Sequence, residues 1–273
     1  MTPHQVEGMI NDHRRINPRH FILEIYSPSI ANQIKPGQFV MLKVSEENSP
    51  LLRRPFSVYK SYSDRHTEKE KRGHLSILYK QVGIGTQKMT LLRKGQKVNL
   101  IGPLGNGFTL PPLPSSSDVI IIGGGVGIVS LCSLLEPLKG SRIFIFIGGK
   151  TKDDILCVND FKRTDSKLFI ATEDGGLGTQ GTVLDLYGAR KNKLLRNKIY
   201  YIYACGPIPM LKSLAEISIS KNLICQVSLE SRMGCGFGAC WGCVVKTKYQ
   251  KNIYQRVCQD GPVFPLENIL WDS

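Results

Sequence analysis

The chain has 273 residues and a formal net charge of +14, because 36 lysine and arginine residues outnumber 22 aspartate and glutamate residues. With 41% hydrophobic and 21% charged residues, it has the composition of a globular protein of about two domains, which excludes disordered and fibrous chains. The best candidate for a membrane span, the uncharged run of residues 119–135, is shorter than the roughly 20 residues that a span requires and contains four glycines.

The N-terminal sequence and the distribution of charge indicate a cytoplasmic protein. Residues 1–10 contain no basic stretch followed by an apolar one, so we expect no secretory signal. The basic residues are scattered and no nucleic-acid-binding motif accompanies them, so we interpret the positive charge as a solvated or partner-facing surface. A reducing compartment also favours cysteines that act as ligands or redox groups over cysteines in disulfides.

Residues 1–110 have the pattern of a small antiparallel β-barrel. Apolar and polar residues alternate at 21–26 and 75–79, and a Lys-Pro-Gly-Gln turn precedes an apolar segment at 39–44. The charged stretch 60–74 interrupts the alternation, and we expect a surface loop or an extended hairpin there.

A segment rich in proline and serine, residues 111–117, predicts a linker. After it, apolar segments at 119–122, 142–147, 167–171 and 198–203 alternate with predicted helices, the first at 129–138, which favours a parallel α/β sheet. The sequence therefore predicts a multidomain β plus α/β protein. Its parts are an antiparallel barrel or sandwich at 1–110, a parallel α/β domain at 118–224 and a small cysteine-rich module at 225–273.

Four cysteines near the C-terminus form the most specific motif. They are Cys235, Cys240, Cys243 and, after fourteen further residues, Cys258. The spacing C-x4-C-x2-C…C is that of plant-type [2Fe-2S] ligation, and the intervening glycines would leave backbone N–H groups free to point at the sulfurs. A structural zinc site is the alternative, although zinc usually takes two separated C-x2-C pairs and this chain has one.

A run of glycines follows the strand predicted at 119–122. It contains Gly123, Gly124, Gly125 and Gly127. Glycines at a strand-to-helix turn let the backbone approach a pyrophosphate, so this turn is a candidate pyrophosphate site. Ile128, however, stands where the dinucleotide fingerprint has its third glycine, and no acidic residue directly follows the segment 142–147.

The residues after that segment leave the choice between NAD and NADP open. Lys150 and Lys152 would attract a 2′-phosphate, whereas Asp153 and Asp154 would repel one. We expect NAD.

Three short segments of the predicted barrel suit a flavin. An arginine, an aromatic ring and a hydroxyl on one strand offer a diphosphate ligand, a surface for an isoalloxazine and a hydrogen-bonding partner for its edge. A glycine turn at 83–86, opening a helix predicted at 87–92, offers a second phosphate contact. A basic strand with a plain hairpin turn is the alternative. The candidate residues are Arg54, Pro55, Phe56, Ser57, Leu78, Tyr79, Lys80, Gly85 and Thr86.

Cys205 ends an apolar strand, where α/β sheets place ligands. It is the candidate catalytic residue beside a nicotinamide, and a small buried hydrophobe is the alternative. We expect Cys132, Cys157 and Cys225 to be buried and inert.

These motifs in this order resemble the ferredoxin-NADP reductase superfamily. With the segments 230–243 and 256–264 added, the chain resembles the electron-transfer subunits of the NAD-dependent dihydroorotate dehydrogenases (type B). This resemblance implies FAD on the barrel residues above, a [2Fe-2S] cluster on the four cysteines, and NAD on the α/β domain. It also implies a partner, an FMN-containing catalytic subunit that oxidises dihydroorotate in pyrimidine biosynthesis, in a heterotetramer with two of each chain.

Two alternatives accompany this interpretation. A subunit of a sulfide dehydrogenase or of an NADH-dependent ferredoxin:NADP oxidoreductase would share the same layout. A zinc-stabilised module that binds nucleic acid through its positive charge belongs to a different class.

Overall fold

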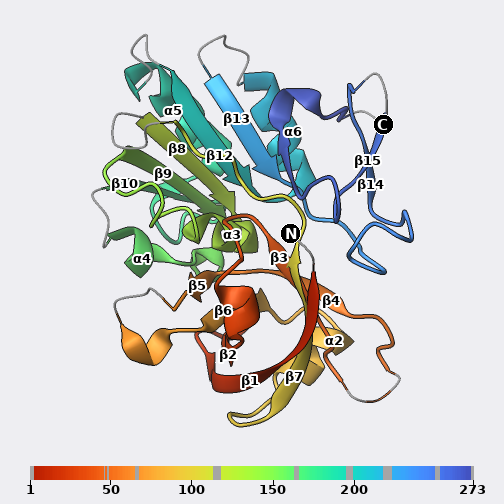
Figure 1. The fold of residues 1–273 in the computed structure, drawn as a ribbon. Helices are drawn as coiled ribbons and strands as arrows, with labels where there is room; N and C mark the ends of the chain where they lie inside the picture. The colour runs from red at the N-terminus through yellow and green to blue at the C-terminus, as the bar shows by residue number, and fades with distance from the viewer. Residues whose placement is uncertain are drawn as a thin grey trace.

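The computed structural model describes residues 3–45, 47, 49–64, 68–112, 118–162, 166–194, 199–217, 223–249 and 253–271. In this part of the chain an antiparallel sheet lies below a mainly parallel one, and the C-terminal segment packs beside both (Figure 1). Residues 113–117 of the predicted linker lie outside the described ranges. The longest described helix has 12 residues, and none there has the length and apolarity to cross a membrane.

The N-terminal half forms a curled antiparallel sheet of seven strands in the order β4-β3-β7-β1-β2-β6-β5. Leu23, Ile25, Val40, Leu75 and Leu100 fill its interior and are inaccessible to solvent. Its elements are β1 (His4–Arg15), β2 (His20–Tyr26), α1 (Pro28–Ala31), β3 (Phe39–Leu42), β4 (Arg54–Ser57), β5 (Lys60–Tyr62), the 3-10 turn η1 (Lys69–Lys71), β6 (His74–Lys80), α2 (Ile84–Met89) and β7 (Lys97–Leu104). The predicted barrel is confirmed.

In this half the charged stretch takes one of its two expected forms, whereas α2 differs from the expectation. The stretch 60–74 contains strand β5, which pairs antiparallel with β6, so it is an extended hairpin; residues 65–67 lie outside the described part. Helix α2 begins at Ile84, three residues before the predicted start. The hydroxyl of Thr86 accepts hydrogen bonds from the N–H groups of Val82 and Gly83, which fixes the first turn earlier in the chain.

The second sheet has the order β11-β10-β9-β8-β12-β13-β16 and is parallel except for β16. Alternate residues of its central strands face opposite layers. Ile120 and Ile122 face α5 and α6, whereas Val119 and Ile121 face α3 and α4. Its elements are β8 (Asp118–Gly124), η3 (Gly125–Gly127), α3 (Ile128–Cys132), β9 (Arg142–Gly149), η4 (Lys152–Asp154), α4 (Val158–Lys162), β10 (Ser166–Thr172), β11 (Thr179–Gln180), α5 (Val183–Leu194), β12 (Tyr200–Cys205), α6 (Ile208–Ile217) and β13 (Leu223–Ser228).

Helix α3 is shorter than the helix predicted at 129–138. The hydroxyl groups of Ser130 and Ser133 bond back to the carbonyls of Gly127 and Ser130, and beyond Cys132 the backbone continues in i to i+3 turns. The predicted helix therefore becomes one helical turn followed by tighter turns.

The C-terminal segment contains the hairpin of β14 (Val244–Lys246) and β15 (Tyr254–Arg256), followed by β16 (Val263–Pro265) and η5 (Leu266–Asn268). Strand β16 pairs with β13 at the edge of the parallel sheet. The boundary expected between residues 224 and 225 falls inside β13, so we propose to place it at about residue 229. Apolar periodicity could not locate this boundary, because the apolar strand β13 ends immediately before the cysteine-rich stretch.

Candidate functional site

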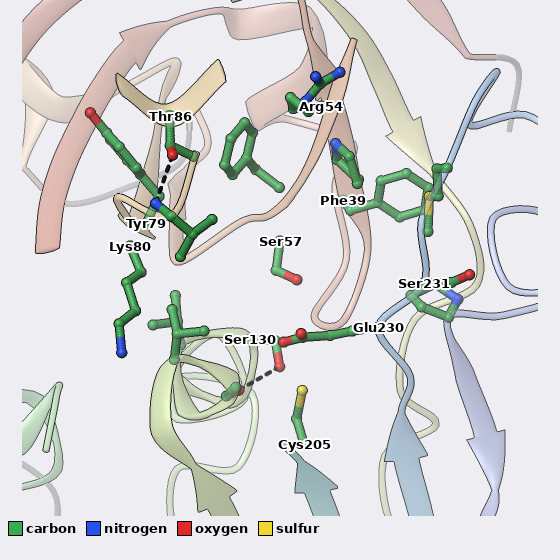
Figure 2. A pocket seen from close by; sticks show the side chains of 18 of the residues that line it. Phe39, Arg54, Ser57, Tyr79, Lys80, Thr86, Ser130, Cys205, Glu230 and Ser231 are labelled. Atoms are coloured by element: carbon green, nitrogen blue, oxygen red, sulfur yellow. Dashed lines mark hydrogen bonds between the residues drawn. The ribbon is translucent and has the colours of Figure 1, made fainter. Parts of the chain in front are cut away.

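A cavity of 790 Å³ lies between the barrel and the parallel sheet. All nine barrel residues expected to bind flavin line it, although they come from β4, β6 and the start of α2. Cys205 and the segment 228–233 line it from the other side. We call this space the first cavity; Figure 2 shows its side chains.

Arg54 and the first turn of α2 form one end of the first cavity (Figure 2). A Cβ atom on Gly85 would stand 3.2 Å from Nε of Arg54, so the missing side chain lets the guanidinium lie against the turn. The first N–H groups of a helix lack intrahelical partners and, with an arginine beside them, suit a diphosphate. The Thr86 hydroxyl already bonds within the turn, so this side chain also shapes the turn.

Aromatic side chains form the barrel side of the cavity. Tyr79 is buried, stacks on Phe21 with 5.4 Å between ring centroids and meets Phe56 edge to face at 6.0 Å. The Tyr79 hydroxyl lies 3.0 Å from Nε2 of His13, which fixes the ring. This packed cluster gives the cavity a rigid apolar wall against which a planar ring can lie.

At the opposite end, Cys205 at the tip of β12 points toward Ser130 and Glu230, and Ser57 lies across from them (Figure 2). Burial and the nearby Glu230 carboxylate raise the pKa of the Cys205 thiol to about 12, so it stays protonated at neutral pH. Glu230 is accessible to solvent from the cavity, but the surrounding protein desolvates its carboxyl and raises its pKa.

A second cavity of 1010 Å³ opens at the carboxyl ends of the parallel strands. Gly124, Gly125 and Gly127 line it, and Gly125 has a φ of +55° with open space where a Cβ would be. Gly123 does not line it. A Cβ there would come within 2.3 Å of the Ile128 side chain, so this glycine instead permits the close packing of α3 on β8.

The acidic residue missing after β9 has a counterpart after the next strand. Glu173 follows β10 and lines the second cavity together with Lys150 and Asp154. Its position depends on the parallel pairing of β9 with β10, which brings Thr172 beside Gly149. Local sequence around β9 therefore could not reveal it.

Four residues, Lys80, Val126, Gly127 and Glu230, line both cavities. The two cavities therefore meet next to Cys205 and Ser130, which lie at the inner end of the first cavity. A flavin ring in one cavity and a nicotinamide ring in the other would face each other at this junction.

Three of the four motif cysteines lie in the loop before β14 and Cys258 follows β15; we call them together the cysteine loop. They associate in two pairs, because the N–H of Cys240 donates to the Cys235 sulfur and the N–H of Cys258 donates to the Cys243 sulfur, each at 3.4 Å. The N–H of Gly238 also donates to the Cys258 sulfur, at 3.1 Å. Burial opposes ionisation of Cys235, but the surrounding backbone N–H groups outweigh it and lower its pKa to about 6.

This arrangement fits an iron-sulfur cluster, because two irons with two thiolates each need two pairs of sulfurs with donors around them. The cysteine loop also adjoins the first cavity. A Cβ on Gly236 would approach the side chain of Met41 on β3 to 2.4 Å, and Met233, two residues before Cys235, lines the cavity. The loop therefore packs against β3 of the barrel and, through Met233, reaches the edge of the first cavity.

Several site residues carried no predicted role. Ser130, Ser228 and Glu230 surround Cys205, and Glu173 lines the second cavity. Glu230 follows a buried strand of a parallel sheet, the position where such sheets place ligands, so this general rule could have identified it.

Comparisons with known proteins agree with this geometry. Residues 230–270 match the model of the iron-sulfur cluster binding domain of dihydroorotate dehydrogenase B. The chain is 38% identical over 260 residues to the dihydroorotate dehydrogenase B (NAD(+)) electron transfer subunit of Desulforamulus reducens, covering 94% of this chain and 95% of that protein. The corresponding subunit of Bacillus caldolyticus is 37% identical over 253 residues, covering 92% and 93%.

Solved structures show the same fold. An NADH-dependent reduced ferredoxin-NADP oxidoreductase, studied for flavin-based electron bifurcation, has a TM-score of 0.81 at 29% identity, covering 97% of this chain and 90% of that one. The ferredoxin reductase in carbazole 1,9a-dioxygenase has a TM-score of 0.66 at 17% identity, covering 82% and 69%, which supports the fold alone.

Proposed function

Since this chain belongs to the electron transfer subunits of dihydroorotate dehydrogenase B, an oxidoreductase of pyrimidine biosynthesis, we propose that it holds FAD, NAD and a [2Fe-2S] cluster. FAD occupies the first cavity, NAD the second, and the cluster the loop of four cysteines. The junction of the two cavities at Lys80, Gly127 and Glu230, beside the cysteine loop, is the observation that carries this proposal.

The bound flavin and cluster would together supply conversion between hydride transfer and single-electron transfer. The residues of this chain bind and orient. Arg54 and the turn before Thr86 receive the FAD diphosphate, while Tyr79 and Phe56 support the ring system. Ser57 offers a hydroxyl to the ring edge.

At the junction, Cys205 and Ser130 confine the nicotinamide. Because its pKa is raised, Cys205 acts there as a neutral thiol and not as a nucleophile. Its role is thus contact and positioning.

We favour NAD over NADP as the nucleotide. Glu173 lines the second cavity with Asp154 and Asp185, and three carboxylates would repel a 2′-phosphate. Of the two lysines that follow β9, Lys150 lines the cavity, and Lys80, which also lines it, is paired with Asp154 at 2.7 Å. A carboxylate such as that of Glu173 can accept hydrogen bonds from ribose hydroxyls.

Cys235 and Cys240 as one pair, and Cys243 and Cys258 as the other, would hold the cluster. The N–H···S hydrogen bonds within each pair support this assignment.

As an electron transfer subunit, the chain works with a catalytic dihydroorotate dehydrogenase subunit. We propose that this partner holds FMN and the dihydroorotate site, and that two of each chain form a heterotetramer. Exposed apolar side chains around the cysteines, Phe237, Trp241, Val244 and Tyr254, offer a docking surface next to the cluster. The family favours this function over a sulfide dehydrogenase subunit or a nucleic-acid-binding zinc module.

The test is the visible spectrum of anaerobically purified protein, titrated with NADH and, in parallel, with NADPH. We expect flavin bands with a broad iron-sulfur shoulder, bleached by NADH at concentrations at which NADPH has little effect. The matched variant Cys240→Ser should lose the shoulder and keep the flavin bands. A featureless spectrum after reconstitution with FAD, iron and sulfide would contradict the proposal, and equal bleaching by NADPH would contradict the choice of NAD.

A further inference from the structure

Two cysteines outside the iron-sulfur motif lie together at the junction of the barrel and the parallel sheet. Cys132 is the last residue of α3, and Cys157 immediately precedes α4. The sulfurs of both and a carboxylate oxygen of Asp160 all lie within 4.8 Å of one another. The sequence predicted two buried, inert thiols here. Cys132 is buried as expected, whereas Cys157 is half-buried and neither is isolated.

The local backbone brings the second thiol and the carboxylate together. The carbonyl of Cys157 accepts hydrogen bonds from the N–H groups of Asp160 and Phe161, so Cys157 stands at the start of α4 and Asp160 lies one turn later. Cys157 has a φ of +62°, a conformation uncommon for residues with a side chain. The Cys157 thiol and the Asp160 carboxylate are thereby directed at the Cys132 sulfur, which belongs to α3.

Residues from the barrel hold the carboxylate. The hydroxyl of Tyr59 donates a hydrogen bond to one oxygen of the Asp160 carboxylate, and the Nζ of Lys60 donates to the other. The Asp160 side chain is 13% exposed and that of Lys60 is 30% exposed. Metal-binding carboxylates are commonly oriented by such outer hydrogen bonds.

From these three convergent side chains we propose a zinc site, with Cys132 Sγ, Cys157 Sγ and one oxygen of Asp160 as ligands and a water as the fourth. Tetrahedral zinc, with bonds of about 2.3 Å to sulfur and about 2.0 Å to oxygen, separates its ligand atoms by roughly 3.3–3.8 Å. The three atoms therefore need to approach one another by at most about 1.5 Å. The half-exposed side of Cys157 admits the water.

Charge and chemistry favour this ion. Two thiolates and the Asp160 carboxylate carry three negative charges, and Zn²⁺ with the Lys60 ammonium carries three positive ones, so the site is neutral as a whole. A neutral set avoids the cost of leaving net charge in a buried place. Thiolates with a carboxylate select zinc over magnesium or calcium, which prefer oxygen ligands alone.

Zinc at this position would join three parts of the fold. It ties the end of α3 to the start of α4 directly, and Asp160 extends the connection to Tyr59 and Lys60 of the barrel. The site is separate from the iron-sulfur cysteines in sequence and uses none of the four. Its occupancy can therefore be measured while the cluster is intact.

The test counts metals in the protein purified with its flavin and cluster, after dialysis against zinc chloride and then against zinc-free buffer. Mass spectrometry of the metals should find about one zinc per chain alongside about two irons. Zinc X-ray absorption should show two sulfur and two lighter ligands. Cys157→Ala and Cys132→Ala should each lose the zinc and retain iron and flavin, which also reports that they fold, whereas Cys225→Ala, another buried cysteine, should retain all three.

Three outcomes would overturn the proposal. The first is zinc below a tenth of an equivalent in the unaltered protein. The second is zinc retained in both the Cys132 and Cys157 variants, or bound by four sulfurs, which would place it on the cluster cysteines. The third is a Cys132–Cys157 disulfide, found by peptide mass spectrometry, in place of the metal. None of these results depends on whether the chain transfers electrons.

Discussion

Glu230 is one of the four residues that line both cavities, and among these four it alone carries a carboxylate. Its carboxylate stands where the nicotinamide ring would face the flavin, and this ring is positively charged in NAD⁺ but neutral in NADH. We therefore expect Glu230→Gln to weaken NAD⁺ binding about tenfold and to change NADH binding much less. Calorimetric titration of the oxidised protein with each nucleotide measures both.

The pH dependence gives a second check on Glu230. Because its pKa is raised, the carboxyl becomes protonated at a higher pH than an ordinary glutamate does. NAD⁺ affinity should fall as the pH drops through this raised pKa, and Glu230→Gln should remove that dependence. The control is Glu216→Gln, because Glu216 lines only the second cavity. Equal losses of NAD⁺ and NADH affinity would contradict the assigned role.

At the residue scale, the sequence identified contacts within motifs better than contacts between them. The segments of Arg54, Tyr79 and Gly85 each had a recognisable motif, and all three line one cavity. Glu173 and Glu230 had none, because their positions depend on which strands lie side by side. Gly123 belonged to the glycine motif but packs against Ile128. A motif therefore predicts the kind of site without distinguishing glycines that face a ligand from glycines that face the core.

At the scale of elements, the hairpin of β14 and β15 supports the cysteine loop through Arg256. Its guanidinium donates to the carbonyl of Gly238 at 3.0 Å, bonds the Asp260 carboxylate at 3.1 Å and lies 4.6 Å from the ring centroid of Trp241. Trp241 has a φ of +57°, so the loop adopts a conformation that needs external support.

We expect Arg256→Ala to retain flavin and to weaken iron retention about tenfold, as loss of an outer contact of a metal site commonly does. The rate of iron transfer to a chelator under anaerobic conditions measures this. Lys248→Ala removes a positive charge from the same segment, at a residue whose N–H bonds to Asn268, and is the matched control. Iron release at the unaltered rate in Arg256→Ala would show that the loop needs no such support.

Element types were more predictable than element lengths. The alternation at 21–26 and the apolar run at 142–147 correspond to β2 and β9. Helix α3 is shorter than its apolar pattern suggests because serine hydroxyls compete for backbone carbonyls. Strand β16 was not predicted, since three residues give no periodicity and its pairing with β13 is a tertiary contact.

At the scale of the whole molecule, the barrel and the parallel sheet must keep a fixed relation, because the two cavities meet where they touch. Lys80 of β6 pairs with Asp154 after β9 at 2.7 Å, and Nδ2 of Asn17 donates to the carbonyl of Asp153 at 2.9 Å. Both side chains of the ion pair are largely covered, with 26% of Lys80 and 15% of Asp154 exposed. Burial would raise the pKa of Asp154, but the Lys80 ammonium outweighs it and lowers the pKa.

We expect Asp154→Asn to lower the midpoint of thermal unfolding by about 2–4 °C at pH 7, the effect of roughly 1 kcal/mol in a chain of this size. A carboxyl with a lowered pKa stabilises the fold above its unfolded-state pKa, and this contribution is lost as the pH falls through the folded-state value. The difference between Asp154→Asn and the unaltered protein should therefore be constant from pH 7 to pH 5 and shrink below about pH 4.

Calorimetry of the cofactor-free protein measures this difference without interference from the acid-sensitive cluster. Asp153→Asn is the matched control, since Asp153 accepts its hydrogen bond from the barrel on its backbone carbonyl, which the substitution leaves in place. Two results would show that the ion pair does not hold the two halves together. One is an equal decrease of the unfolding midpoint in both variants, and the other is a difference between Asp154→Asn and the unaltered protein that persists unchanged at low pH. The fixed relation would then depend on other contacts between the halves. These include the bonds of Tyr59 and Lys60 to Asp160 and the apolar contacts of Leu78 and Phe108 with the sheet.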